Sequence, residues 1–113
     1  MSGAIHPSRQ LVLEEVVRQP DNAGGFTEIW TALGTVWADV QAGYGHEREM
    51  TAATLSYVPY RIKVRAAPEG APSRPKAGQR FVDGPRIFKI LAVADYGHDG
   101  RYVECFTKEE VSA

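Results

Sequence analysis

The stretch GGFTEIWTALGTVWADV, residues 24–40, decides how the rest of the chain is interpreted. Apolar and small residues recur on alternate positions in it, which is the period of one face of a β-strand; they are Trp30, Ala32, Gly34, Val36, Ala38 and Val40. The positions between them are also largely apolar, and no charge interrupts the segment between Glu28 and Asp39. A strand with two apolar faces is typical of the centre of a small barrel, so we expect the chain to pack around this segment.

Strand patterns also lie on either side of this stretch. Within it, Thr35–Val40 is the clearest strand, whereas Thr27–Leu33 also fits a helical turn. Upstream, Gln10–Pro20 is rich in valine and ends at a proline, which favours a strand over the alternative of a helix. Between them, residues 21–25 (DNAGG) are typical of a tight turn.

The second half of the chain repeats this alternation. It predicts strands at Tyr60–Ala66, Gln79–Val82, Arg86–Asp95 and Arg101–Thr107, separated by glycine turns and by a proline-rich link over residues 68–78. We therefore predict an all-β fold, a small antiparallel β-barrel or sandwich of five to six strands. One domain is expected over residues 10–108, with a flexible arm over 1–9 and a frayed end over 109–113. The expected core residues are Trp37, Val40, Ile62, Val64, Phe88, Ile90, Leu91 and Val93.

A long connection follows the central strand. Residues 41–57 break the alternation with two glycines and a run of charges, which favours a surface loop with a short helix as the alternative. Loops this long in small domains are often functional. The residues of interest in it are Gln41, Gly43, Tyr44, Gly45, His46, Glu47, Arg48, Glu49 and Met50.

The only concentrated basic feature lies on the next strand. Its alternation places Arg61, Lys63 and Arg65 together on one face, opposite Tyr60, Ile62 and Val64. Such a face is either a solvated surface paired with acidic neighbours or a basic ribbon that faces nucleic acid or an acidic protein.

Overall composition limits the functional classes. The chain has 113 residues and a net charge of −1, which is not the basic excess of a general nucleic-acid-binding domain. Its single cysteine excludes an internal disulfide, and a reducing compartment is expected. No apolar run approaches the roughly 20 residues of a membrane span, and the first residues lack a secretory pattern. We expect a cytoplasmic protein, or part of something assembled there, that makes no membrane contact.

Catalytic and metal-binding patterns are weak. His6, His46 and His98 lie in separate segments, and no spacing matches a known metal motif, so no metal or cofactor is expected. Cys105 lies in the middle of a strand, where a free cysteine usually packs as a small apolar residue rather than acting as a nucleophile. We predict that the protein is not an enzyme.

The order of these features resembles the phage head–tail joining family, also called head closure, stopper or connector proteins of tailed phages, prophages and gene transfer agents. The resemblance covers residues 9–110. It rests on a co-linear set: VVRQPDNAGGF, VWADV, a glycine-and-charge segment (GYGHERE), YRIKVR, and DGPRIFKILAVAD, followed by RYVECFTKEE. No single motif in this set is specific, but their order is.

The resemblance implies a structural role in virion assembly. Family members form a ring, of six or twelve subunits, in the virion neck between the portal or adaptor protein and the tail terminator or tail tube. It further implies assembly in the bacterial cytoplasm and transient contact with packaged double-stranded DNA. The long loop of the family helps to close the DNA channel, and here that loop corresponds to residues 41–57.

Two alternatives come from other classes of protein. A small barrel that binds single-stranded nucleic acid would use the basic strand for phosphates and aromatic side chains for stacking; the candidates are Trp30, Tyr44, Tyr60, Phe88 and Tyr102. A ligand-binding or enzymatic barrel is disfavoured because no set of polar residues converges in the sequence.

Overall fold

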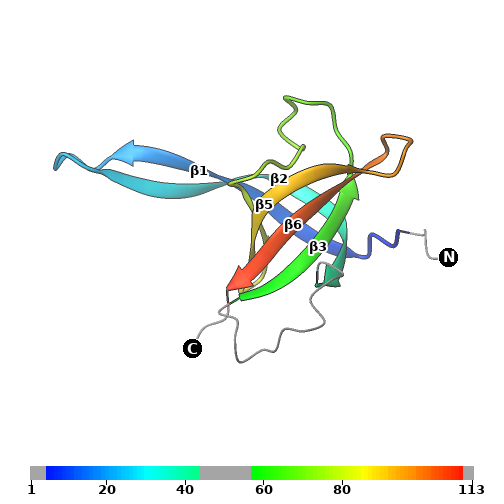
Figure 1. Ribbon diagram of the computed structural model, residues 1–113. Helices are drawn as coiled ribbons and strands as arrows, with labels where there is room; N and C mark the ends of the chain where they lie inside the picture. Colours follow the sequence, from blue (N-terminus) through cyan, green and yellow to red (C-terminus); the bar gives the residue numbers. More distant parts are fainter. Residues whose placement is uncertain (1–4, 44–56, 111–113) are drawn as a thin grey trace.

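The computed structural model describes residues 5–43 and 57–110, which form six β-strands (Figure 1). They are β1 (Arg9–Pro20), β2 (Phe26–Ala42), β3 (Tyr57–Arg65), β4 (Arg80–Asp83), β5 (Arg86–Tyr96) and β6 (Tyr102–Glu110). The described part of the chain contains no helix, so none there is long and apolar enough to cross a membrane. The all-β prediction is confirmed, and the helical alternatives for residues 10–20 and 27–33 are wrong.

The strands form one antiparallel sheet that closes on itself in the order β1-β2-β3-β6-β5-β4. Closure comes from a short pairing of β1 with β4, where Leu13 lies opposite Phe81. β3 and β5 are not adjacent, because β6 lies between them and pairs with both. The sixth strand in the sequence therefore lies between two earlier strands.

The core is the interior of this closed sheet, the barrel. Its buried residues come from all six strands: Leu11, Leu13, Ala38, Ile62, Val64, Phe81, Phe88, Ile90, Val103 and Cys105. Ala38, from the central stretch, is buried, and the predicted core residues Val40 and Val93 pack against the core as partly buried residues. Each large apolar side chain in this core contributes about 1.5–3 kcal/mol of burial free energy.

Two residues expected in the core lie outside it. Trp37 is 56% exposed, because it alternates with the buried Ala38 and so points away from the interior. Leu91 is 48% exposed, because the pairing of β5 with β6 shifts register between Ile90 and Ala92. This bulge leaves Leu91 outside the ladder and brings Val93 onto the inner face after Ile90.

A two-stranded arm extends away from the barrel, on the left in Figure 1. We define the arm as residues 15–31, in which the ends of β1 and β2 pair from Glu15 with Thr31 to Pro20 with Phe26. It ends in the turn predicted at residues 21–25, where Asp21 accepts hydrogen bonds from the backbone N–H groups of Ala23 and Gly25 at 2.8 and 2.9 Å. The arm starts at a second bulge, between Leu13 and Glu14, where β2 contributes an extra residue next to Gly34.

The link between β3 and β4 lies against the barrel without regular structure. Its turns are held by backbone hydrogen bonds from Ala71 to Pro68 and from Arg74 to Ala71, both 3.0 Å. Pro75 is buried, and Gly78 donates to the carbonyl of Ile90 on β5 at 3.0 Å. The proline-rich prediction for this segment agrees with the structure.

Candidate interaction surfaces

The ends of the long loop meet at one end of the barrel. Ala42 lies opposite Tyr60, and the N–H of Gly43 donates to the carbonyl of Pro59 at 2.7 Å. The side chain of Arg61 donates to the carbonyl of Gly43 at 3.1 Å, which fixes the loop entry a second time. Of the predicted loop residues, only Gln41 and Gly43 lie in the described part; Tyr44, Gly45, His46, Glu47, Arg48, Glu49 and Met50 lie outside it.

The predicted basic face of β3 is not a continuous exposed ribbon. Lys63 is only 4% exposed; its ammonium lies 3.6 Å from Glu104 on β6 and 3.4 Å from the amide oxygen of Gln41 on β2. The ring of Tyr96 packs over the same group, 4.8 Å from its centroid. Arg61 is half-buried and bonds the loop entry. Of the three cations, Arg65 is therefore the one that is exposed. Lys63 therefore follows the simpler interpretation, a cation paired with an acidic neighbour.

The outer face beside Lys63 is covered by the start of the described chain. The backbone N–H of His6 donates to the carboxylate of Asp39 at 3.0 Å, and Asp39 is only 8% exposed. Asp39 also lies opposite Lys63 across the β2–β3 pair. This contact holds part of the N-terminal segment, which was predicted to be flexible over residues 1–9, against the barrel.

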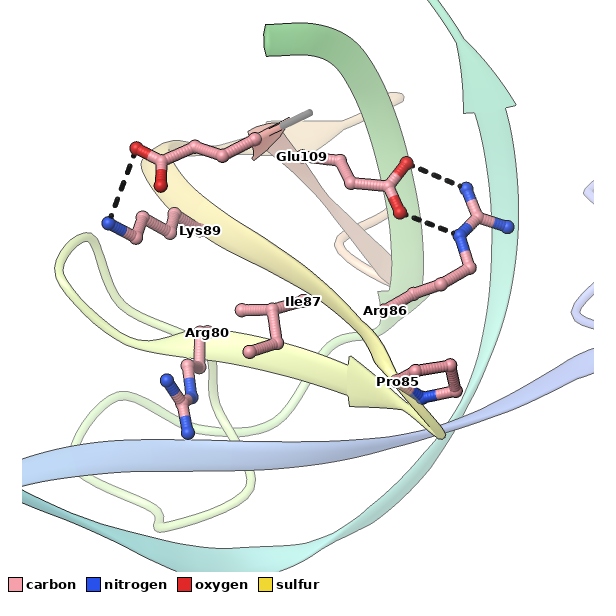
Figure 2. Close-up of a pocket in the computed structure, with 7 residues that line it drawn as sticks. Arg80, Pro85, Arg86, Ile87, Lys89 and Glu109 are labelled. Atoms are coloured by element: carbon pink, nitrogen blue, oxygen red, sulfur yellow. Dashed lines mark hydrogen bonds and ion pairs between the residues drawn. The ribbon is translucent and has the colours of Figure 1, made fainter. Parts of the chain in front are cut away.

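A pocket of about 280 Å³ lies where β4, β5 and β6 meet (Figure 2). Its charged lining is already paired. Figure 2 shows the guanidinium of Arg86 facing the carboxylate of Glu109, with two hydrogen bonds of 2.7 and 2.9 Å. Arg80 bonds Glu14 at 2.8 Å, and Lys89 lies 3.5 Å from Glu110.

The Arg86–Glu109 pair in this pocket is bidentate. Hydrogen bonding to Arg86 lowers the pKa of Glu109 below its ordinary value, and the same bond raises the pKa of Arg86. Arg86 also donates to the hydroxyl of Tyr60 at 3.0 Å and lies 4.9 Å from the ring centroid of Phe88. The cations in this pocket are therefore committed to internal partners, and the pocket is a poor anion site.

Two apolar surfaces are open to a partner. One is a groove of about 380 Å³ beside the exposed Trp37; it is lined by Pro7, Thr35, Val36, Trp37, Arg65, Ala66, Ala67, Ser73 and Tyr102. The other is the arm, where Val16, Val17, Phe26 and Ile29 are between 36% and 61% exposed. The exposure of the arm shows that the expectation of a chain packed around residues 24–40 is wrong for residues 24–31, because alternation does not show how far a hairpin continues beyond its neighbours.

The described residues offer no catalytic constellation. Cys105 is buried, and this burial, together with the nearby Glu104 carboxylate, raises the pKa of the thiol to about 12. His98 lies in the turn between β5 and β6. Over residues 5–43 and 57–110, no group of three His, Cys, Asp or Glu side chains could hold a metal ion.

The aromatic residues considered for base stacking do not form an exposed series. Phe88 is fully buried, and the ring of Tyr60 packs edge-on against it, with centroids 5.1 Å apart. The ring of Trp30 is covered by Arg80, whose guanidinium lies 4.0 Å from its centroid. Tyr102 is half-buried, and Tyr44 lies outside the described residues. The described surface therefore gives no support to a single-strand binding function.

Comparisons with known proteins agree with the family suggested by the order of motifs. A sequence model of a family described as phage head completion protein matches residues 4–110. A chain in the solved virion of a native gene transfer agent particle is 55% identical; the match covers 94% of this chain and 96% of that chain, with a TM-score of 0.77. A solution structure of a Shigella flexneri 2a protein shares the fold, with a TM-score of 0.65 at 20% identity over 99% of this chain and 98% of that one. No curated protein matches the chain.

Proposed function

The chain belongs to the phage head completion protein family, and on this premise we propose that it is a structural virion protein that joins the head of a phage-like particle to its tail. The observation that carries the proposal is the match over nearly the whole chain to a component of a gene transfer agent virion. A part of this kind acts through its surfaces and its rigidity rather than through a catalytic pocket.

The barrel meets the mechanical demand of this role. A sheet closed on itself has no open edge within the barrel, and its core draws on every strand, so load on any one strand is shared. The outer charges are largely paired within the chain, at Arg80, Arg86 and Lys89 among others. The exposed apolar surfaces, the arm and the Trp37 groove, are then the sites where neighbouring proteins bind.

The finer role that we propose is a ring in the neck of the particle. The ring lies between the portal or adaptor protein and the tail, and residues 41–57 reach the central channel and help to retain the DNA. The barrel end where Gly43 and Pro59 meet supplies a fixed base for this loop. Trp37 is the proposed anchor for an adjacent protein, since tryptophan is favoured in interface centres and this one is exposed beside an apolar groove.

The near-neutral charge suits a channel through which DNA must pass. With 13 basic and 14 acidic residues, the chain has no excess of cations to hold phosphates. Contact with DNA in this role is transient, and affinity for free DNA is expected to be weak.

The test is deletion of the gene from the element that encodes it. We expect DNA-filled or leaking heads and separate, complete tails, as seen by electron microscopy of lysates, and rescue by the gene supplied in trans. Normal tailed particles in the deletion strain would refute a joining role.

A further inference from the structure

The arm has two free edges. β1 pairs with β4 only at Val12–Glu14, and β2 pairs with β3 only at Ala38–Ala42. Beyond these points the two strands of the arm pair with each other alone, as Figure 1 shows. The outer edge of β1 is thus open over residues 15–20, and the outer edge of β2 is open over residues 27–37; within the described chain no backbone hydrogen bond outside the β1–β2 ladder is made there.

The edge of β2 lacks the features that normally prevent strand pairing. Free edges are usually protected by lysine, proline or inward-pointing charges. From residue 27 to residue 37, Glu28 is the only charged residue, and there is no proline. A long uncharged edge of this kind is a template for an added strand from another chain.

The side chains of the arm also lack cover. Val17 and Ile29 lie opposite each other across the two strands, and are 36% and 40% exposed. Alternation along the two strands places Val17 and Ile29 on the same face as the buried Leu13, but farther along the hairpin than the core. Phe26 is 61% exposed, and the guanidinium of Arg18 lies 4.9 Å from its ring centroid. A two-stranded ribbon is marginally stable alone, so this arm gains most from a partner that adds strands to it.

We propose that the arm is the contact between neighbouring copies of this chain, in which the free edge of β2 in one copy pairs with the free edge of β1 in the next. This inference rests on the proposed function for its setting, a ring of subunits. When identical arms point the same way around a ring, β2 of one copy runs antiparallel to β1 of its neighbour. That is the direction already used within each arm.

Charge and symmetry favour a second copy as the occupant. The open β1 edge carries Glu15 and Arg18, and the open β2 edge carries Glu28. Contact between copies in the register used within the arm, where Arg18 lies opposite Glu28 and Glu15 opposite Thr31, brings Arg18 and Glu28 of two copies near each other. Each copy presents two different edges, which makes the contact heterologous, and heterologous contacts close into rings when the rotation allows it. The arms then form a continuous sheet around the assembly.

Cysteine cross-linking in assembled particles tests this arrangement. Gln19 and Thr27 are exposed cross-strand partners within one arm, and the native Cys105 is buried. Gln19→Cys and Thr27→Cys are made as separate chains and co-expressed, and purified particles are treated with a mild oxidant, because a disulfide joins only cysteines whose Cα atoms lie within about 7 Å of each other. We expect cross-linked dimers of this chain when both variants are present and none with either alone.

The outcomes separate this inference from the proposed function. If the chain is absent from purified particles, the proposed function fails. If it is incorporated but the two variants do not cross-link, or if one variant cross-links to itself, the head-to-tail arm contact is overturned.

A second variant tests the contact without relying on register. Ile29→Lys places a charge on the proposed contact, and Leu91→Lys is a matched change at an exposed apolar position on β5. Both chains should fold, as judged by circular dichroism. We expect incorporation into particles to fall by about tenfold or more only for Ile29→Lys, the effect of roughly 1.4 kcal/mol at one contact. Equal incorporation of the two variants would contradict the proposal.

Discussion

Cys105 illustrates how an isolated reactive group can be made inert by its position. The thiol lies in the barrel interior, and its pKa is raised to about 12. We expect no reaction with a thiol reagent at pH 8 in the native protein and complete reaction of one thiol in urea, because only the thiolate is nucleophilic. Rapid labelling of the native protein would show that the strand containing Cys105 opens readily.

The Arg86–Glu109 pair predicts a pH dependence. Glu109 has a pKa below its ordinary value of 4.5 in the folded protein, so its contribution is present above that value and is lost as the pH falls through the folded pKa. Glu109→Gln should therefore cost about 1 kcal/mol of unfolding free energy at pH 7, because the pair is bidentate but partly exposed. The difference from wild type should shrink toward pH 3 in urea titrations.

Glu110→Gln is the matched control. Its carboxylate lies 3.5 Å from Lys89, and both side chains are about half exposed. A change within about 0.5 kcal/mol is expected at pH 7. A pH-independent cost for Glu109→Gln would contradict the electrostatic origin of the effect.

At single positions, alternation predicted two faces for each strand but not which face lies inside. Ala38 and Trp37 are adjacent, and the smaller residue is buried while the larger faces out. Ile62, Val64, Phe88 and Ile90 were placed in the core and are buried, because β3 pairs regularly with β6 and the bulge in β5 comes only after Ile90. Leu91 was misplaced because a bulge, set by pairing with β6, has no marker in the local sequence.

At the scale of elements, Gly34 marks where the arm begins. Its φ is +149°, a backbone conformation that residues with a side chain rarely adopt, although a β-carbon added at this position would meet no atom within 4 Å. Gly34→Ala should therefore destabilise the protein through the backbone alone, by about 1–3 kcal/mol in urea titrations. Ala32→Ser, an exposed change on the same strand, should stay within about 0.5 kcal/mol. Unchanged stability of the Gly34→Ala variant would show that the bulge can relax.

At the scale of elements, we also expect that the long loop can be shortened while the barrel stays folded. In the described part of the chain the buried core residues belong to the six strands, and the loop ends are held by Gly43 and Pro59. Replacing residues 44–53 by a short glycine–serine link should leave the melting temperature within a few degrees and abolish infectious or gene-transferring particles. Loss of folding in this variant would show that the segment is structural. Normal particles would contradict its proposed role in the DNA channel.

The strands were predictable because most contain at least four alternating residues, and the turns because glycine and proline mark them. The arm was not predictable, because its length depends on where β3 and β4 stop pairing with β2 and β1. Those are contacts between residues such as Ala38 and Val64, or Val12 and Val82, that are distant in the sequence. The burial of Lys63 likewise depends on Glu104, which pairs with it from β6.

At the scale of the whole molecule, the balance of charge predicts weak binding to free DNA. The net charge is −1, and most described cations have internal partners. We expect no binding to single- or double-stranded DNA at micromolar protein in about 150 mM salt, as measured by fluorescence anisotropy. Micromolar affinity that weakens steeply with salt would favour the single-strand binding alternative instead.

The position of β6 determines when the chain can fold. β6 is synthesised after the other five strands, yet it lies between β3 and β5, and barrel closure also needs β4 to reach back to β1 near Leu13. Until β6 has been synthesised, the growing chain can form only pairings among β1–β5, such as the β1–β2 and β4–β5 hairpins, and pairing between strands distant in the sequence is slow. A chain that terminates prematurely and lacks β6 therefore cannot close the barrel, because β3 and β5 lose the strand that pairs with both.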